Sequence, residues 1–493
     1  MNNNIINSVK RYHDVLYYAH VTDKKKMNIT SIIALLVTSN YKKFSSEYEK
    51  LLLNQEQKAS EILVSLGEEY LKTLKLDADF STKVLNGWNE IKSMTALNNL
   101  EKDKQHINII LIIKSFIDDC LPNIKNDDSK NTIDFIGLLF AELNGRGSNG
   151  KTGIVLTPFF LADFMTELLE LDYKNDVVFD GACGSGAFIV AAYSKMNAKM
   201  QKDFADGKIT ADERNAYSLR LSKSFFGNDL NEEMAILALT NFALLGINIK
   251  NISNKDFFDL DGYYFSKNKI NKGILNPPFE YEPSKFADHM CKNIYGVQTS
   301  GVKKLVIVCP PQAMGKKHMI LSSILNNATL RSVIEIQPNA FVESNVNVST
   351  SVFVFDIGRP HKAEDEIVYY DFSDSGFEYY KDSGLVDKFE KFEDNKKTAI
   401  STIKDPKEIR ERSSNRDILS FFKIDDSQNF IAHIDPKEIA KKNVEETDLT
   451  KANQEMKIIL SEKQSIVDSY KNVIPNSQEF EDYLVDILSE VGE

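Results

Sequence analysis

Apolar residues recur along this 493-residue chain with two different spacings, and the spacing changes near residue 175. Before that point the apolar positions follow a helical period, in residues 5–18, 30–37, 62–74 and 107–117. Glycine and proline are sparse until Pro122, as a helical bundle prefers. We therefore expect residues 1–125 to form an N-terminal helical domain, which serves as a scaffold or as a docking site for a partner.

From residue 175 onward, short buried apolar runs alternate with helical segments. We expect seven strands, at residues 177–179, 224–227, 249–252, 273–275, 305–308, 332–336 and 351–357. The last strand is expected to run antiparallel to the one before it. This alternation predicts a doubly wound α/β domain over residues 126–360, with its ligands at the carboxyl ends of the strands.

The pattern changes again after Pro360, where the sequence turns acidic and rich in tyrosine and predicts little regular structure. After Pro436 a helical pattern returns, and a short last helix is expected at residues 480–488. The apolar face of this tail consists of Leu449, Ala452, Met456, Ile459, Ile466 and Tyr470. We interpret residues 361–493 as a C-terminal extension that ends in a partner-docking helix.

Composition narrows the class of protein. The four cysteines, Cys120, Cys183, Cys291 and Cys309, are scattered without a CxxC pair, which favours a reducing cytoplasm and argues against a metal site. Neither a signal peptide nor an apolar run long enough to span a bilayer is visible, so we expect a cytoplasmic protein that does not enter membranes.

The net charge of −12 bears on nucleic acid as a partner. Proteins that hold DNA by themselves usually carry a basic stripe, because neutralising phosphates supplies much of the affinity. Here lysine and arginine are interleaved with acids throughout the sequence. Either the surface that binds DNA is local, or another subunit supplies most of the contact, or the substrate is not nucleic acid.

One glycine-rich stretch, Gly145 to Thr152, matches the phosphate-binding pattern GxxxxGK[ST]. That pattern requires a strand before the loop and a helix after it. Here a helix is expected before the loop and an extended segment after it, so we favour a flexible loop over an ATP site. The next segment, Thr157-Pro158, is expected to open a helix at residues 159–171, with Thr157 as its N-cap.

Polar residues and a glycine turn follow the first three predicted strands of the α/β domain. Asp180 ends the first strand, and a turn with the sequence GACGSGA leads into a helix, as in nucleotide-binding folds. Asp229 ends the second strand, where such folds bind ribose hydroxyls, although it could instead cap the next helix. Asp256 follows the third strand and could accept an adenine amino hydrogen or simply form a turn.

The fourth strand ends in Asn276-Pro277-Pro278-Phe279. Consecutive prolines are stiff and cannot continue a sheet ladder, so the segment offers a side-chain amide, backbone carbonyls and an aromatic ring. The Asn276 oxygen and a proline carbonyl can each accept one N–H of an amino group on a planar base, while Phe279 stacks on the ring. The alternative is an ordinary turn after a strand.

In their order and spacing these motifs resemble the modification subunit of type I restriction–modification systems, an N6-adenine DNA methyltransferase. The resemblance rests on Leu156-Thr157-Pro158, Asp180 to Gly186, Gly227 to Asn231, Asp256 and Asn276 to Phe279. It covers residues of about 130–357, and the helical flanks also look like that family. It implies a Rossmann-like methyltransferase domain that uses S-adenosylmethionine.

The resemblance also implies a role for each motif. The residues implied to bind the cofactor are Leu156, Thr157, Pro158, Asp180, Ala182, Cys183, Gly184, Gly186, Asp229 and Asp256. Asn276, Pro277, Pro278 and Phe279 would hold a target adenine flipped out of double-stranded DNA. The sequence departs from the family at Gly181, where proline is usual, at Asp229, where glutamate is usual, and at Leu156, where an aromatic residue is usual.

Family members of this kind work with a specificity subunit and a second modification subunit, and a restriction subunit is a further partner left open. Because no long insertion resembles a target-recognition domain, we expect the lone chain to methylate DNA poorly. Three alternatives remain open: a methyltransferase acting on RNA or on a protein glutamine, an assembly protein that binds nucleotide at Gly145 to Thr152, and a binding subunit without catalysis.

Overall fold

The structure is a computed structural model, and it describes residues 3–21, 23–38, 44, 58–94, 97, 107–124, 134–143, 156–315, 318–342, 348–380, 384–405 and 419–422. All of the described residues belong to one compact unit, Met1–Pro436. The predicted tail helices and the Gly145 to Thr152 loop lie outside the described residues. None of the helices in the described part of the chain combines the length and apolar character needed to cross a membrane.

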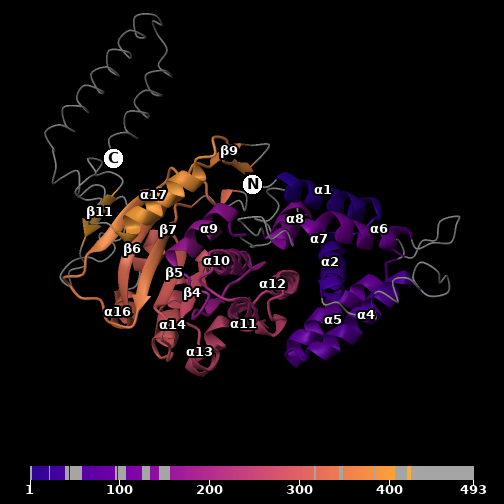
Figure 1. The fold of residues 1–493 in the computed structure, drawn as a ribbon, viewed down its shortest axis with the longest axis horizontal. Helices are drawn as coiled ribbons and strands as arrows, with labels where there is room; N and C mark the ends of the chain where they lie inside the picture. The colour runs from indigo at the N-terminus through magenta and orange to yellow at the C-terminus, as the bar shows by residue number, and fades with distance from the viewer. Residues whose placement is uncertain are drawn as a thin grey trace, which may run out of the picture. The chain divides into compact units, whose positions relative to one another are not determined.

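The N-terminal part is helical, as its apolar period predicts (Figure 1). Its elements are α1 (Asn3–Tyr18), α2 (Asp23–Thr38), α4 (Ala59–Leu74), α5 (Ala78–Lys92), α6 (Ile107–Ser115), the π-helical turn Phe116–Cys120, α7 (Leu121–Ile124) and α8 (Phe135–Leu143). Trp88 and Tyr12 are fully buried among these helices. The domain boundaries at residues 125 and 360 stay predictions.

A nine-stranded sheet follows, in the order β11-β8-β6-β7-β5-β4-β1-β2-β3. The strands are β1 (Val178–Asp180), β2 (Phe225–Asn228), β3 (Ile252–Ser253), β4 (Lys272–Leu275), β5 (Lys303–Cys309), β6 (Ala328–Ile336), β7 (Ser351–Ile357), β8 (Ile367–Phe372) and β11 (Leu419–Phe422). The first five strands are mutually parallel, and β7 runs antiparallel to both β5 and β6. The α/β fold and the antiparallel last strand are confirmed, with two strands more than the seven predicted.

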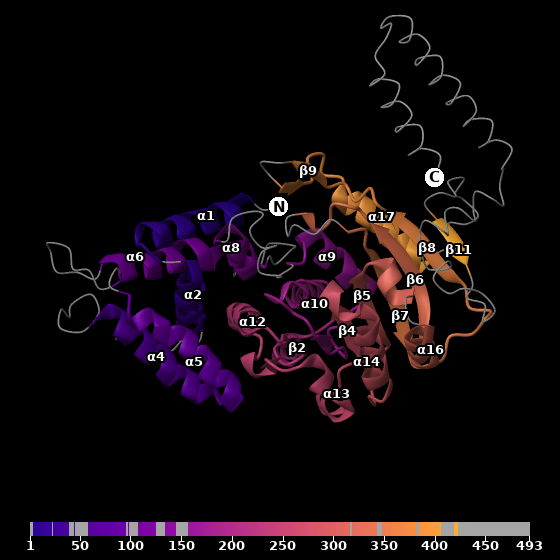
Figure 2. The ribbon, with the colours of Figure 1, turned by 180° about the vertical axis from the view of Figure 1, so that it is seen from behind.

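Helices cover both faces of the sheet, as a mostly parallel sheet requires (Figures 1 and 2). One layer contains α9 (Phe159–Leu168), α10 (Ala187–Ala205) and α12 (Glu232–Leu245), with α11 (Ala211–Leu221) packed on α10. The other contains α13 (Gly262–Asn268), α14 (Pro283–Tyr295), α15 (Pro311–Gly315) and α16 (His318–Asn327). This arrangement leaves the ends of the strands as the places where a ligand can reach the sheet.

The prediction of little regular structure after Pro360 is wrong. Strand β8 joins the main sheet parallel to β6, and five of its six residues are buried. A hairpin of β9 (Glu378–Tyr380) and β10 (Gly384–Val386) follows, and then α17 (Phe392–Lys404), which packs on α9 and β8. The acidic residues around β8 hide its apolar run in the sequence. In the structure, side chains on both faces of this strand are buried.

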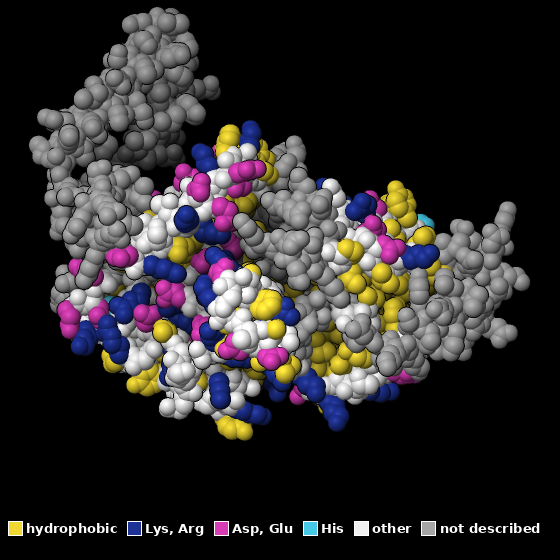
Figure 3. Space-filling model, viewed as in Figure 1, with side chains coloured by type: hydrophobic (Ala, Val, Ile, Leu, Met, Phe, Trp, Pro, Cys, Tyr) yellow, Lys and Arg dark blue, Asp and Glu magenta, His cyan; other side chains and the backbone are white. Residues whose placement is uncertain are grey.

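Charged side chains are mixed by sign on the surface of the described residues. On the face shown in Figure 3, dark blue lysine and arginine side chains lie among magenta aspartate and glutamate side chains. This pattern agrees with the interleaving seen along the sequence.

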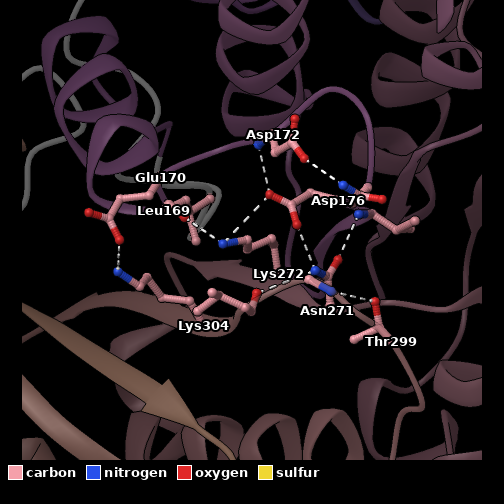
Figure 4. A network of polar contacts seen from close by, with 12 residues as sticks. Leu169, Glu170, Asp172, Asp176, Asn271, Lys272, Thr299 and Lys304 are labelled. Atoms are coloured by element: carbon pink, nitrogen blue, oxygen red, sulfur yellow. Dashed lines mark hydrogen bonds and ion pairs between the residues drawn. The ribbon is translucent and has the colours of Figure 1, made fainter.

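A polar network joins the amino ends of β1 and β4 (Figure 4). The Asp176 carboxylate accepts hydrogen bonds from the Asp172 backbone N–H at 2.8 Å and from the Asn271 side chain at 2.7 Å. Lys272 lies 3.6 Å from the same carboxylate and donates to the Leu169 carbonyl at 2.8 Å. Burial lowers the pKa of Lys272, and the charge of Asp176 partly offsets this. The network holds the two strands in register, so that their carboxyl ends meet at the opposite edge.

Candidate functional site

The structure brings the predicted strand-end residues together at one edge of the sheet. Asp180 is the last residue of β1, Asp229 follows β2 and Asn276 follows β4. These strands are parallel neighbours, because β1 pairs with both β2 and β4. Asp256 lies on the same side, three residues after β3, which pairs with β2.

The glycine turn between β1 and α10 is held open by two residues with left-handed backbone. Gly184 has φ of 54° and Gly186, the N-cap of α10, has φ of 94°. A Cβ on Gly184 would meet no described atom within 4 Å, so a ligand could approach the backbone here. The turn is tied to β2 by the Cys183 N–H, which donates to the Asn228 carbonyl at 2.9 Å.

Asp180 lies beneath this turn and is fully buried. Its Oδ1 accepts the Ala182 N–H at 3.2 Å, whereas its Oδ2 is buried without a hydrogen-bond partner in the described residues. Burial raises the pKa of this carboxyl well above its usual value; the Ala182 N–H opposes the rise, and the nearby charge of Asp229 adds to it. A buried carboxylate oxygen without a donor is costly unless a ligand supplies one.

Asp229 links the glycine turn to the next helix. Its Oδ2 accepts the Gly184 N–H at 2.8 Å, and its Oδ1 accepts the Asn231 N–H at 2.9 Å. The N-cap of α12 is Asn231, so Asp229 supports the helix start without being its cap. Burial raises the pKa of Asp229, although these two backbone donors lower it again. A carboxylate has about four acceptor positions, so each oxygen keeps one for a ligand.

The departure from the family at Gly181 has a structural reason. A Cβ on Gly181 would lie 2.3 Å from the Phe257 ring, closer than any side chain tolerates. Phe257 itself stacks on Phe286, with ring centroids 5.0 Å apart. The aromatic ring therefore fills the space that a proline at position 181 would need.

Asp256 is exposed and caps the short 3₁₀ turn Phe257–Asp259. Its Oδ1 accepts the Phe258 N–H at 3.0 Å, which is the turn-forming role that the sequence left open. A role toward a cofactor stays a prediction for this residue.

The segment after β4 is joined to the start of α9. The Asn276 amide donates to the Thr157 hydroxyl at 3.1 Å, across 119 residues of sequence. The expectation that Thr157 caps α9 is wrong, because Pro158 is the N-cap residue and no side chain caps this helix. The Thr157 hydroxyl is oriented toward Asn276 instead, and no described residue donates to Asn276 Oδ1.

The three residues that follow Asn276 differ in how far they are buried. Pro277 is buried, whereas Pro278 is exposed and Phe279 is half-buried. The Phe279 ring meets the buried Phe341 ring edge to face, with centroids 5.8 Å apart. Leu156 is half-buried and packs against the core.

Several residues that support this edge were not predicted from the sequence. They are Asp134, Ser185, Asn241, Asn254, Phe257 and Phe341. Ser185 lies inside the glycine turn, so the turn motif could have identified this residue from the sequence. Asn254 and Phe257 lie beside Asp256 in the sequence, whereas Asp134, Asn241 and Phe341 come from other elements and belong to no predicted motif. Among the described residues, no group of three or more His, Cys, Asp or Glu side chains is arranged to hold a metal ion.

The fold is a doubly wound α/β fold, and proteins of this class bind their ligands at the carboxyl ends of the strands, which is where the residues described above lie. Residues 140–293 match the family model of N-6 DNA methylases. The part of the chain that contains this edge is therefore similar to N-6 DNA methylases, and the chain resembles the methylase subunits of restriction systems.

Similar proteins agree with this assignment. The chain is 27% identical over 268 residues to the type II restriction enzyme and methyltransferase RM.BcgI of Heyndrickxia coagulans, covering 52% of this chain and 40% of that protein. It is 22% identical over 323 residues to the type I restriction enzyme MjaVII methylase subunit of Methanocaldococcus jannaschii, covering 57% and 51%. The chain thus spans about half the length of these curated relatives or less.

A solved chain of the type I R-M system shares the fold. It superposes with a TM-score of 0.57 at 15% identity, covering 95% of this chain and 96% of the other. The likeness therefore includes the N-terminal helices as well as the sheet.

Proposed function

We propose that this chain transfers a methyl group from S-adenosylmethionine to N6 of an adenine in DNA, as the modification subunit of a type I restriction–modification system. The observation that carries the proposal is the position of Asn276 to Phe279, at the end of β4 and beside the open glycine turn of β1. The match of residues 140–293 to N-6 DNA methylases supports it.

The residues at the edge fit such a cofactor. Asp180 Oδ2 is a buried acceptor without a donor among the described residues. Each carboxylate oxygen of Asp229 accepts one backbone N–H and has a second acceptor position that a ligand can use. Hydroxyl and ammonium groups of S-adenosylmethionine are donors of this kind. Gly184 leaves space for a ligand against the backbone. The bound cofactor would supply an electrophilic methyl group on its sulfonium centre.

The chain contributes alignment of the amine. Asn276 Oδ1 and the Pro277 carbonyl can each accept one N–H of the amino group of a flipped adenine. These two hydrogen bonds take the lone pair of N6 out of conjugation with the ring and direct it toward the methyl group. Thr157 orients the Asn276 amide by accepting its N–H, which leaves the oxygen for the base. Phe279, supported by Phe341, supplies a ring on which the base can stack.

Partners complete the proposal. We expect the chain to act on double-stranded DNA together with a specificity subunit and a second modification subunit. The net charge of −12 and the mixed surface of Figure 3 favour a division of labour in which the specificity subunit provides most of the DNA contact.

The test is transfer of a tritiated methyl group to DNA by the chain together with its specificity subunit. Asn276→Ala is expected to reduce the rate by about 100-fold or more, because an aligning group at the reacting atom is lost. Asn327→Ala is a matched control, since among the described residues the Asn327 side-chain amide donates only to the Ser323 carbonyl within α16. Full activity of Asn276→Ala would refute the base-binding role. Methylation of RNA or of a glutamine peptide, but not of DNA, would establish the alternative substrate.

A further inference from the structure

The helix that precedes the sheet reaches the glycine turn through a half-buried carboxylate. Asp134 stands immediately before α8, and its Oδ2 accepts the Ser185 hydroxyl at 2.5 Å. Ser185 is part of the turn between β1 and α10 and is itself buried. This contact joins the N-terminal helices to the backbone that would surround the cofactor.

A third residue closes the contact into a ring. The Asn241 amide, from α12, donates to Asp134 Oδ1 at 2.7 Å and to the Ser185 carbonyl at 2.7 Å. Asp134 Oδ1 also accepts the Gly137 N–H at 2.7 Å. Both sides of Ser185, its hydroxyl and its carbonyl, are therefore held, which restricts the turn to one arrangement.

The approach of Asp134 depends on a glycine. A Cβ on Gly137 would lie 2.2 Å from Asp134 Oδ2 and 2.9 Å from the Ser185 hydroxyl. The backbone of α8 is thus close enough to the turn to exclude any larger residue. Three donors converge on the carboxylate, as suits its ionised form, although burial raises its pKa.

A second, independent contact reaches the neighbouring loop. The Asn254 amide donates to the carbonyls of Asp229 and Leu230, at 2.8 Å and 3.0 Å. Lys83, from α5, donates to Asn254 Oδ1 at 2.8 Å and so fixes the orientation of that amide. The N-terminal helices therefore brace two of the backbone segments that carry predicted cofactor residues, the glycine turn and the loop of Asp229.

We propose that Asp134 is a positioning residue for the cofactor, through which the N-terminal helices set the geometry of the glycine turn by way of Ser185. The inference rests on the proposed function, since it takes S-adenosylmethionine as the ligand of the turn. It follows that a partner which displaces these helices changes the affinity for the cofactor.

The experiment measures the dissociation constants of S-adenosylmethionine and S-adenosylhomocysteine by calorimetry on the full chain. Asp134→Ala is expected to raise both constants about tenfold, the effect of losing a hydrogen bond to a charged group. Ser185→Ala should raise them similarly, and the double variant should bind no more weakly than Asp134→Ala. Asp134→Asn keeps the cap for Gly137 and a partner for Ser185, so it should recover most of the affinity.

The matched control is Ser31→Ala. The buried hydroxyls of Ser31, in α2, and Thr240, in α12, lie 3.0 Å apart, so this variant weakens the same interface without touching the turn. It should lower the melting temperature and leave both dissociation constants unchanged. Wild-type affinity in folded Asp134→Ala, additive effects in the double variant, or an equal loss in Ser31→Ala would overturn the inference alone. Absence of binding by the wild-type chain would overturn the proposed function with it.

Discussion

At the scale of single residues, Asp180 is a buried carboxyl whose ionisation is unfavourable in the folded chain. Its side chain is fully buried at the end of β1, and Oδ2 has no partner within the described residues. Burial raises the pKa of the carboxyl, against the Ala182 N–H and with the added effect of Asp229. Such a group destabilises the ligand-free fold whenever it is ionised.

The pH dependence of unfolding tests this. The pKa of this carboxyl is higher in the folded state than in the unfolded state. As the pH rises from the unfolded-state pKa to the folded-state pKa, the unfolded chain ionises first, and the folded state loses stability relative to it. Asparagine does not ionise. Without cofactor, Asp180→Asn should match the wild type near pH 4 and exceed its free energy of unfolding by about 1 kcal/mol or more above pH 7.

The measurement is urea denaturation at several pH values, with Glu364→Gln as control because that side chain is 71% exposed. Asp180→Asn should also bind S-adenosylmethionine more weakly than the wild type. A difference in unfolding free energy that stays constant between pH 4 and pH 8 would contradict the expected ionisation.

At the scale of elements, α17 and α10 together hold α9, the helix that follows Thr157. Asp163 in α9 is buried and lies 2.6 Å from Lys195 in α10 and 2.5 Å from Lys396 in α17. Burial acts to raise the pKa of Asp163, but the two ammonium groups outweigh it, so the pKa is lowered. The segment after Pro360 thus helps to place the residue that orients Asn276.

Asp163→Asn is expected to lower the free energy of unfolding by about 3 kcal/mol at pH 7, because two largely buried ammonium groups lose their buried counter-charge and keep only the more exposed Glu167 and Glu393. A lowered pKa in the folded state means that the wild-type advantage persists from pH 8 down to pH 5. This advantage in stability is lost only as the pH falls below the usual pKa of an aspartate carboxyl toward the lower pKa that Asp163 has in the folded state.

Chemical denaturation at pH 8, 7 and 5 measures the effect of Asp163→Asn. Glu167→Gln is the control, since Glu167 is 40% exposed and pairs only with Lys195, and it should cost less than about 1 kcal/mol. Equal costs for the two variants would show that burial of the pair does not decide its contribution.

At the scale of the whole molecule, the chain is acidic, and its lysine and arginine residues are interleaved with acids along the sequence. The net charge is −12, and the visible face of Figure 3 mixes both signs. Long-range attraction to phosphates must then come from another subunit or from a local surface.

We therefore expect the purified chain alone to incorporate little tritiated methyl into DNA and the addition of its specificity subunit to raise incorporation strongly. Cofactor binding should be measurable in both samples, since the residues that fit the cofactor belong to this chain. Robust, sequence-specific methylation by the lone chain would show that it reads its target itself.

The sequence predicted seven strands of the sheet, β1 to β7, because each is a short apolar run between turn residues. Two predictions failed for identifiable reasons. Strand β8 was missed because acidic and tyrosine residues surround its buried core. The third strand is shorter than predicted, because residues Ile249–Asn251 form a 3₁₀ turn before β3.

The residues of the candidate site also fall into two groups, those that the sequence predicted and those that it did not. Asp180, Asp229 and Asn276 could be found because each directly follows, or ends, a predicted strand, and their order matches a known family. Asp134 could not be found, because its partners Ser185 and Asn241 are 51 and 107 residues away. No local pattern encodes which distant side chain will supply a carboxylate to a turn.

The sequence by itself determined seven strands of the sheet, β1 to β7, and it determined that Asp180, Asp229 and Asn276 lie at strand ends, since these features depend on apolar period and turn chemistry within a few residues. The tertiary structure alone decided the order of the strands and the bracing of the glycine turn by the N-terminal helices. It also decided the contact of Thr157 with Asn276. These features arise from packing and hydrogen bonds between segments far apart in the chain, where burial selects the partner.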